Sequence, residues 1–285
     1  MANDILFAGA IAAIEHDSDA LVFVNDVFGD VRELRKDGTD NIANGKIGTP
    51  ISALKWGSSG ARVYYLDAHN NVREVCQDGK GWYDGNLSQG KHIAAPYSSI
   101  SSVTIFEHEI RVYAQLPNNT IQEFMWHNSK WAEGTNLGHA LPGTSIAATS
   151  WANKHIRVYF QDGDLNVIEK AWDEGGWYTG NLRFSSNVTR VNLGVTSWGD
   201  GKNLGIRLYY ATSDNTLKEK AWDGGGGWYD GGFKHECVPG SRVAATPSPK
   251  LRVYFQSGAM KSAALTEMVW SNGWHASKDS LPRAV

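Results

Sequence analysis

One motif occurs six times along the sequence, and this repetition constrains the fold more than any other feature. Five copies contain an arginine at the start of an Arg-(Val or Leu)-Tyr run: Arg62, Arg111, Arg157, Arg207 and Arg252. Successive arginines are 49, 46, 50 and 45 residues apart, and in a weaker first copy Leu21 takes the place of the arginine. A period of this length is typical of repeat proteins in which each copy forms one supersecondary unit.

Each copy is predicted to form four short strands. It begins with an apolar run of small residues, such as IAAI from Ile11 or VAAT from Val243, which suits an innermost strand near a crowded axis. The Arg-Val-Tyr segment, a segment that ends in glutamate and an aromatic residue, and a Trp-Tyr segment follow, separated by polar turns. Helical periodicity is absent. We therefore predict an all-β fold, a six-bladed β-propeller with four antiparallel strands per blade.

The copies fill the chain from end to end. We therefore expect a single propeller domain over residues 1–285, which is an acceptable length for one all-β ring. The blades are expected at approximately 9–47, 48–96, 97–142, 143–189, 190–239 and 240–285.

Composition argues against several kinds of partner. The formal net charge is −3 and no basic run occurs, so nucleic acid is not an expected partner. The sequence has no run of about 18 apolar residues, so insertion into a membrane is not expected. Cys76 and Cys237 fit neither a disulfide framework nor a structural metal site, and we expect two free buried thiols. Asp4 stands where a secretion signal carries positive charge, so we expect a cytoplasmic protein, or one that is released or reaches the cell surface by an unconventional route.

A glutamate follows the first position of each copy at a fixed distance. Five pairs are twelve residues apart: Leu21 and Glu33, Arg62 and Glu74, Arg111 and Glu123, Arg157 and Glu169, and Arg207 and Glu219. An even separation about a central turn predicts that arginine and glutamate are directly opposed on a hairpin, and hence on one face. Three extra residues between Arg252 and Glu267 lengthen the last hairpin and keep both partners.

Two tryptophans follow the glutamate in four copies. The first lies three residues later and the second lies beyond a turn that contains glycine or asparagine, as in Trp126 and Trp131, Trp172 and Trp177, Trp222 and Trp228, and Trp270 and Trp274. Trp56, Trp151 and Trp198 instead close innermost strands, and we expect them to pack in the core.

A guanidinium, a carboxylate and two indoles together match the surface of a sugar. The carboxylate accepts hydrogen bonds from adjacent hydroxyls, the guanidinium donates to oxygens, and an indole offers an N–H donor and an apolar face. The same residues also allow a structural interpretation, in which arginine and glutamate form a repeated cross-strand ion pair and the tryptophans wedge neighbouring blades together. The chemistry of the residues alone does not separate the two interpretations.

The order of Arg-Val-Tyr, glutamate, an aromatic residue and a tryptophan after a glycine turn resembles the fucose-specific lectins of fungi typified by the Aleuria aurantia lectin, over nearly the whole chain. The resemblance implies a multivalent lectin for L-fucose and fucosylated oligosaccharides on glycoproteins or cell surfaces. It also implies sites between consecutive blades, with arginine and glutamate from one blade and both aromatics from the next. Four complete sites follow: Arg62, Glu74, Trp126 and Trp131; Arg111, Glu123, Trp172 and Trp177; Arg157, Glu169, Trp222 and Trp228; and Arg207, Glu219, Trp270 and Trp274.

Blade one lacks this chemistry on both sides. In the implied site between the first two blades, Leu21 and Gln77 replace the arginine and the first aromatic residue. The site that closes the ring faces Lys36 and a stretch without aromatic residues. The two degraded sites keep Glu33 and Trp82, and Arg252 and Glu267, respectively. We expect blade one to be retained because it closes the ring, since an open sheet edge is a liability.

Two other functional classes compete with a lectin. Some six-bladed propellers are sialidases, but the Asp-box repeats of those enzymes are absent and the arginines are dispersed one per copy. Glycoside hydrolysis requires paired carboxylates at one bond, whereas the glutamates repeat around the ring. A protein-interaction propeller without sugar binding is the second alternative, although the marks of WD40 repeats are missing.

We therefore expect no enzymatic activity and no cofactor. Metal-independent binding is expected because the sequence shows no acidic oxygen cluster of the kind that Ca²⁺ requires. Whether the ring forms a homodimer is left open by the sequence.

Overall fold

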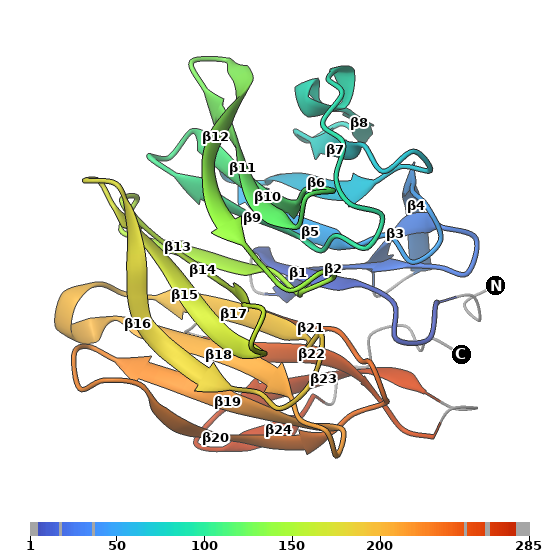
Figure 1. Cartoon of the computed structure of the whole chain (residues 1–285). Helices are drawn as coiled ribbons and strands as arrows, with labels where there is room; N and C mark the ends of the chain where they lie inside the picture. Colours follow the sequence, from blue (N-terminus) through green and yellow to red (C-terminus); the bar gives the residue numbers. More distant parts are fainter. Residues whose placement is uncertain (1–4, 17–18, 36–37, 248–249, 260–262, 278–285) are drawn as a thin grey trace.

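The computed structural model describes residues 5–16, 19–35, 38–247, 250–259 and 263–277. These residues form six sheets of four antiparallel strands each, arranged in a ring (Figure 1). The predicted six-bladed propeller is therefore confirmed.

Within each blade the strands follow one another from the centre outward, and each pairs with the next in sequence. Blade one comprises β1 (Ile11–His16), β2 (Asp19–Asn25), β3 (Asp30–Arg35) and β4 (Gly38–Asn44). Blade two comprises β5 (Ile51–Trp56), β6 (Gly60–Leu66), β7 (Val72–Gln77) and β8 (Trp82–Asp84), followed by the short 3₁₀ helix η1 (Asn86–Gln89). Blade three comprises β9 (Ile100–Ile105), β10 (Glu109–Gln115), β11 (Thr120–His127) and β12 (Lys130–His139).

The second half of the chain repeats this arrangement. Blade four comprises β13 (Ala147–Trp151), β14 (His155–Gln161), β15 (Asn166–Asp173) and β16 (Trp177–Ser185). Blade five comprises β17 (Leu193–Trp198), β18 (Gly205–Ala211), β19 (Thr216–Asp223) and β20 (Tyr229–Glu236), with η2 (Gly201–Asn203) before β18. Blade six comprises β21 (Val243–Thr246), β22 (Arg252–Ser257), β23 (Ala264–Trp270) and β24 (Trp274–Ala276).

The innermost strands surround the axis and are made of small residues because they approach one another closely. Each of β1, β5, β9, β13, β17 and β21 contacts the innermost strand of both neighbouring blades, and β21 contacts β1. At Gly194 a Cβ atom would lie 2.5 Å from the carbonyl oxygen of Val243 in β21. The glycine thus permits an approach of β17 to β21 that any side chain would prevent.

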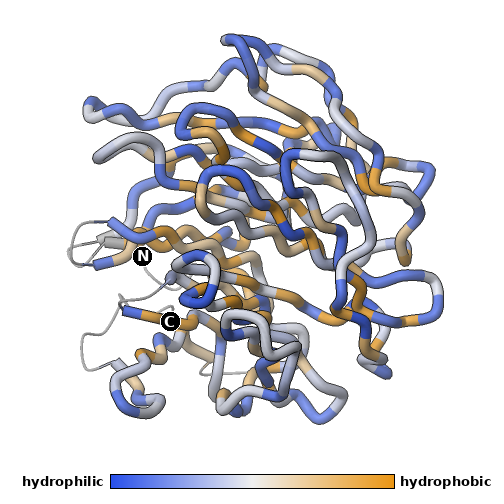
Figure 2. The backbone as a smooth tube through the Cα atoms, turned by 90° about the vertical axis from the view of Figure 1, so that its left-hand side faces the viewer, coloured by the Kyte–Doolittle hydropathy of each residue, from blue (hydrophilic) through white to orange (hydrophobic). Residues whose placement is uncertain are grey.

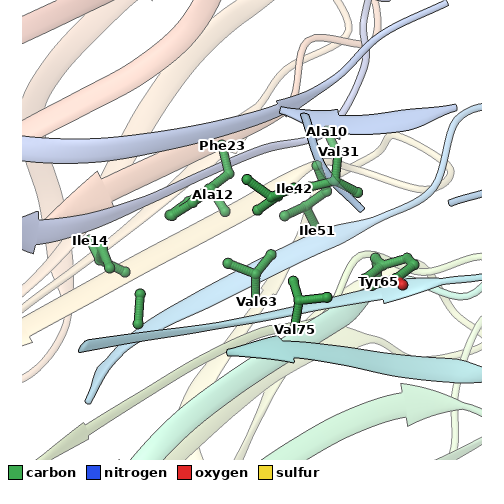
Figure 3. Packing of buried hydrophobic residues seen from close by; sticks show 11 residues of the cluster. Ala10, Ala12, Ile14, Phe23, Val31, Ile42, Ile51, Val63, Tyr65 and Val75 are labelled. Atoms are coloured by element: carbon green, nitrogen blue, oxygen red, sulfur yellow. The ribbon is translucent and has the colours of Figure 1, made fainter. Parts of the chain in front are cut away.

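The hydrophobic core is divided among the seams between blades. Six clusters of buried side chains each combine residues from two adjacent blades, including the pair formed by blades six and one. Figure 3 shows the first cluster, in which Val31 of blade one lies near Ile51 and Val63 of blade two. Figure 2 shows hydrophobic and hydrophilic stretches interspersed along the backbone, and because a blade has a neighbour on each face, every residue of the central strand β6 is buried.

One aromatic contact recurs at five of these seams. The aromatic residue at the third position of the Arg-Val-Tyr run packs edge to face against the second tryptophan of the next blade. The ring centroids are 5.8 Å apart for Phe23 and Trp82, 6.2 Å for Tyr64 and Trp131, 6.0 Å for Tyr113 and Trp177, 6.0 Å for Tyr159 and Trp228, and 6.4 Å for Tyr209 and Trp274. This geometry is the preferred one for aromatic pairs, and it fixes each tryptophan beside the hairpin of the preceding blade.

Buried glutamines join consecutive blades, and one of them closes the ring. Gln161 Nε2 donates to a carbonyl and Gln161 Oε1 accepts from an amide of the segment 188–191, which leads into blade five. Gln256 makes the same two bonds across the ring, because its Nε2 donates to the Leu6 carbonyl at 3.0 Å and its Oε1 accepts from the Ala8 N–H at 2.7 Å. The segment before β1 is therefore attached to blade six as if it were the next link of the chain.

Two further expectations concern the whole chain. Cys76 and Cys237 are free and buried, as the sequence predicted. Among the residues that the structure describes, no helix has the length and apolar character needed to cross a membrane.

The ring-closing role of Gln256 predicts a loss of stability in Gln256→Ala. The substitution removes both hydrogen bonds and leaves the Ala8 amide without this partner, at a cost of about 1–3 kcal/mol, while the Leu6 carbonyl keeps the Gly9 N–H but loses the bond from Gln256. Urea denaturation should show a free energy of unfolding lower by about 2 kcal/mol or more. Gln89→Ala, on the exposed surface of η1, is the matched control and should leave the midpoint unchanged. Equal midpoints for both variants would contradict this role.

Candidate functional site

Arginine and glutamate of each copy lie on one face of a hairpin, but they are not directly opposed. Glu74 pairs with Tyr64 across β6 and β7, whereas Arg62 pairs with Cys76. The reason is that the connection between these strands is centred on His69, where the Asp67 side chain accepts hydrogen bonds from backbone amides. The predicted direct opposition is therefore wrong, while the shared face is correct because the shift is two residues.

Grooves between blades bring the predicted residues together. Between blades two and three, a groove of about 110 Å³ is lined by Trp56, Arg62, Glu74, Tyr83, Trp126 and Trp131, among others. Between blades four and five, a groove of about 80 Å³ is lined by Trp151, Arg157, Glu169, Asn181, Trp222 and Trp228, among others. In both grooves one blade supplies arginine and glutamate and the next supplies both tryptophans.

The other two predicted sets follow the same plan. Tyr113 donates to Glu123 at 3.1 Å, and its ring contacts Trp177 of blade four. Tyr209 pairs with Glu219 across β18 and β19, and its ring contacts Trp274 of blade six. The second tryptophan is thus held next to the glutamate hairpin of the preceding blade in these copies as well.

The glutamates of the four complete sets are buried in their seams, and hydrogen bonds hold Glu74 and Glu123. Glu74 Oε1 accepts from the Tyr64 hydroxyl at 2.9 Å, and Glu74 Oε2 accepts from the Leu87 amide at 3.1 Å. Burial raises the pKa of this carboxyl group, although both hydrogen bonds and the charge of Arg62 oppose the shift. Glycine is required at position 85, directly after β8, because a side chain there would collide with the Glu74 carboxylate.

The arginines rest on the three tryptophans that close innermost strands. The guanidinium carbon lies 5.0 Å from the ring centroid for Arg62 and Trp56, 4.8 Å for Arg157 and Trp151, and 5.0 Å for Arg207 and Trp198. Trp151 is buried and Trp56 packs against a core cluster, as expected, but the tryptophans also support the arginine, and Trp56 and Trp151 line the grooves. The strand pairing explains this position, because Trp56 pairs with Gly60, two residues before Arg62 on the same strand.

A second carboxylate fixes the far side of the guanidinium in three copies. Asp173 accepts from Arg157 Nη1 at 2.9 Å and from Nη2 at 3.2 Å, and the Tyr178 hydroxyl also donates to it. Burial acts against ionisation of Asp173, but these hydrogen bonds lower its pKa to about 2. The equivalent groups are Asp78 with Tyr83 beside Arg62, and Asp223 with Tyr229 beside Arg207. We call this arrangement the Asp–Tyr clamp.

The sequence analysis missed the Asp–Tyr clamp, although a signal was present. The aspartate always lies sixteen residues after the arginine, and the tyrosine directly follows the second tryptophan position. Because the clamp occupies the terminal nitrogens, Arg157 keeps its Nε toward Glu169, whose Oε1 lies 3.3 Å away. The guanidinium is thus oriented before any ligand binds.

The third blade holds its arginine differently. Arg111 Nη2 donates to Glu109 Oε2 at 2.7 Å, and the His127 ring contacts the other oxygen of Glu109. Ala132 stands where the clamp has its tyrosine. The seam between blades three and four therefore gives its arginine a different support.

The two sites beside blade one are engaged by the protein itself. Trp82 Nε1 donates to Glu33 Oε2 at 3.1 Å, and Leu21 packs against the hydrophobic cluster of this seam. At the ring closure, Arg252 Nη2 lies 3.4 Å from Asp19 Oδ1 of blade one and Nε lies 3.1 Å from Glu267 Oε1. Lys36, which was predicted to face this site, lies outside the described residues.

The described residues include no group of three or more histidine, cysteine, aspartate or glutamate side chains that could hold a metal ion. The polar side chains that line the two grooves bear carboxylate, guanidinium, phenol, indole, thiol and amide groups.

Comparison with known proteins identifies the same architecture. The family model described as fungal fucose-specific lectin matches residues 5–284. A fucose-specific lectin of Aspergillus fumigatus is 38% identical, covering 99% of this chain and 98% of the relative. The solved SapL1 lectin in complex with alpha methyl fucoside is 51% identical with a TM-score of 0.93, covering 99% of both chains. The six-bladed Aleuria aurantia lectin superposes with a TM-score of 0.83 at 25% identity, covering 96% of both chains. The chain therefore belongs to the fungal fucose-specific lectin family.

Proposed function

We propose that this protein is a multivalent lectin that binds L-fucose at the ends of glycans in the grooves between its blades, without a metal ion. The observation that carries the proposal is the groove that joins a buried glutamate and an oriented arginine of one blade to two tryptophans of the next. The similar SapL1 lectin was solved with a methyl fucoside, which supports this sugar as the ligand.

The groups of the groove suit a deoxy sugar. The glutamate accepts hydrogen bonds from adjacent hydroxyls, and the arginine donates to ring or hydroxyl oxygens. The indole faces pack against the C–H side and the methyl group of fucose. Trp131 Nε1 is buried without a hydrogen-bond partner among the described residues, and so is Glu219 Oε2 in another seam. A donor and an acceptor in these positions favour a ligand that offers both, as a hydroxyl does.

The clamp aspartates do not supply the acid of a glycosidase. A glycosidase needs one carboxyl group that donates a proton and a second that acts as base or nucleophile. Hydrogen bonds with Arg62 and Tyr83 offset burial and lower the pKa of Asp78, and the corresponding bonds lower the pKa of Asp173. These clamp aspartates stay ionised and committed to arginine, so they do not serve as the proton donor.

The grooves are unequal, and this favours binding to surfaces that carry many fucose residues. Four grooves have the full set of side chains, whereas the two beside blade one have a missing arginine or missing aromatics. Each group that is absent removes hydrogen bonds or stacking of about 1–3 kcal/mol. Several shallow sites that engage one glycoprotein or cell surface gain avidity through effective concentration without new contacts.

Calorimetric titration with methyl fucoside is therefore expected to give close to four strong sites per chain. Addition of EDTA should leave the stoichiometry and the affinity unchanged, because the grooves bind hydroxyls through side chains alone. Haemagglutination should be far more potent than the monovalent affinity implies. Six equal sites would contradict the inequality of the grooves, the absence of any site would contradict the lectin, and loss of binding in EDTA would contradict metal independence.

Glu169→Gln is expected to remove one strong site and leave the fold intact. The amide loses the charge-assisted acceptance of hydroxyl protons, which costs about 2–3 kcal/mol at that site. Burial raises the pKa of Glu169, which means that the folded state disfavours its charge, so a neutral isostere should change the melting temperature little. Calorimetry should count three strong sites.

The matched control is Glu236→Gln, an exposed position at the end of β20, which should keep four sites. A large fall in melting temperature with four intact sites in Glu169→Gln would favour the structural ion pair instead.

Acidification should abolish sugar binding before it unfolds the protein. Burial raises the pKa of the groove glutamates Glu74, Glu123, Glu169 and Glu219, so they take up protons at a higher pH than an ordinary glutamate, whose pKa is about 4.3. A raised folded-state pKa means that protonation favours the folded state, and stability from these groups is lost only as the pH rises through that pKa. The clamp aspartates have lowered pKa values, so their stabilisation is lost only below about pH 3.9.

As the pH is lowered, the affinity for methyl fucoside should therefore begin to fall above the pKa of an ordinary glutamate, about 4.3, while the melting temperature is maintained down to about pH 3.9. Calorimetry and thermal denaturation in the same buffers measure the two quantities. An affinity that is constant down to pH 4 would contradict the role of the buried carboxylates.

A further inference from the structure

A cavity occupies the half of the central channel in which the innermost strands begin. Its volume is about 140 Å³, and it is lined by the first residues of β1, β5, β9, β13, β17 and β21. Small apolar residues and serines make up most of the wall. Arg242, which directly precedes β21, is the one charged residue among those that line the cavity. This cation distinguishes the cavity from an axis that is simply filled by small side chains.

The propeller fold does not require a cation at this place. The residues that directly precede the innermost strands of the other five blades are uncharged: Ala10, Pro50, Ser99, Ile146 and Asn192. Ser99 and Ser145 line the same cavity and bring hydroxyl groups to it. Arg242 is thus a local departure from an otherwise neutral ring of residues.

The bonds of Arg242 leave most of its donors free for a ligand. Arg242 Nη1 donates to Asn192 Oδ1 at 2.6 Å, and Asn192 Nδ2 in turn donates to the Gly240 and Ser241 carbonyls. No ion pair joins Arg242 to another residue within the described parts of the chain. A guanidinium carries five N–H donors, and the one side-chain bond to Asn192 engages a single one of them.

The surroundings of Arg242 are unfavourable for an isolated positive charge. The side chain is exposed, so a solute in the channel can reach it. The protein atoms around it nevertheless withdraw enough water to lower its pKa, and no carboxylate contributes an opposing effect. A charge that is partly removed from water is costly unless an opposite charge accompanies it.

We propose that this end of the channel binds one free tetrahedral oxyanion, inorganic phosphate or sulfate, against Arg242. A guanidinium fork matches two oxygens of such an anion, and serine hydroxyls can donate to the others. The cavity of about 140 Å³ has room for a compact ion beside Arg242. The site is separate from the sugar grooves, because Arg242 lines neither of the two grooves described above.

The bound anion would stabilise the ring where blades five and six meet. Arg242 belongs to blade six, and Asn192 connects it to the start of blade five. A ligand that binds only the folded state raises stability with its concentration until the site is full.

Thermal denaturation in sodium sulfate or phosphate, against sodium chloride at equal ionic strength, tests this proposal. Sulfate also stabilises proteins in general through exclusion from their surface, which gives a gradual rise without saturation. The unmodified protein should show an additional saturating rise of about 2–4 °C at ten times the dissociation constant. Arg242→Gln should lose the saturating part, whereas Arg190→Gln, which removes the same charge from the exposed loop before β17, should retain it.

Calorimetric titration with sulfate should give one site per chain in the unmodified protein, weaker binding in Arg242→Lys and none in Arg242→Gln. Titration with methyl fucoside should be unchanged in all three variants, so failure of the sugar proposal and failure of this one are distinguishable. The proposal is overturned if the unmodified protein shows no saturating response, or if Arg242→Gln responds as the unmodified protein does.

Discussion

A carboxylate buried at the seam between two blades is the interaction on which the rest of this structure depends. Glu74 is held by the Tyr64 hydroxyl of its own blade, and the ring of Tyr64 packs edge to face against Trp131 of the next blade. Burial of a carboxylate is costly unless hydrogen bonds accompany it, so the surrounding donors must be placed accurately. The contacts that meet this requirement also join the blades, and the ligand groove is therefore a consequence of the seam.

The support behind each arginine explains why the grooves differ. In three copies an Asp–Tyr clamp holds the terminal nitrogens, as Asp173 and Tyr178 do for Arg157. In the third copy Glu109 and His127 provide a different support. A side chain that is oriented in advance loses less entropy when a ligand binds, so the supporting residues contribute to affinity without touching the sugar.

Blade one lacks part of the ligand-binding set of side chains, and its residues instead make contacts that close the ring. The Asp19 carboxylate lies across the last seam from Arg252, and Trp82 donates to Glu33 at the first seam. Gln256 attaches the segment before β1 to blade six through Leu6 and Ala8. These contacts join residues that are far apart in the sequence. They close the ring of separate sheets between blade six and blade one.

The sequence by itself determined the number of blades, the four strands of each blade and the shared face of Arg62 and Glu74, because period and parity are properties of local spacing. The resemblance to a known family supplied the partnership between blades. Tertiary structure decided which residues meet. The hairpin is centred on His69, so Tyr64 lies opposite Glu74. Trp56 lies against the Arg62 guanidinium. Arg242 lines the central channel. A shift of register by two residues keeps each side chain on the same face of the sheet but changes every cross-strand partner. Contacts between blades depend on where distant segments meet. The spacing along the chain therefore predicts neither the cross-strand partners nor the contacts between blades.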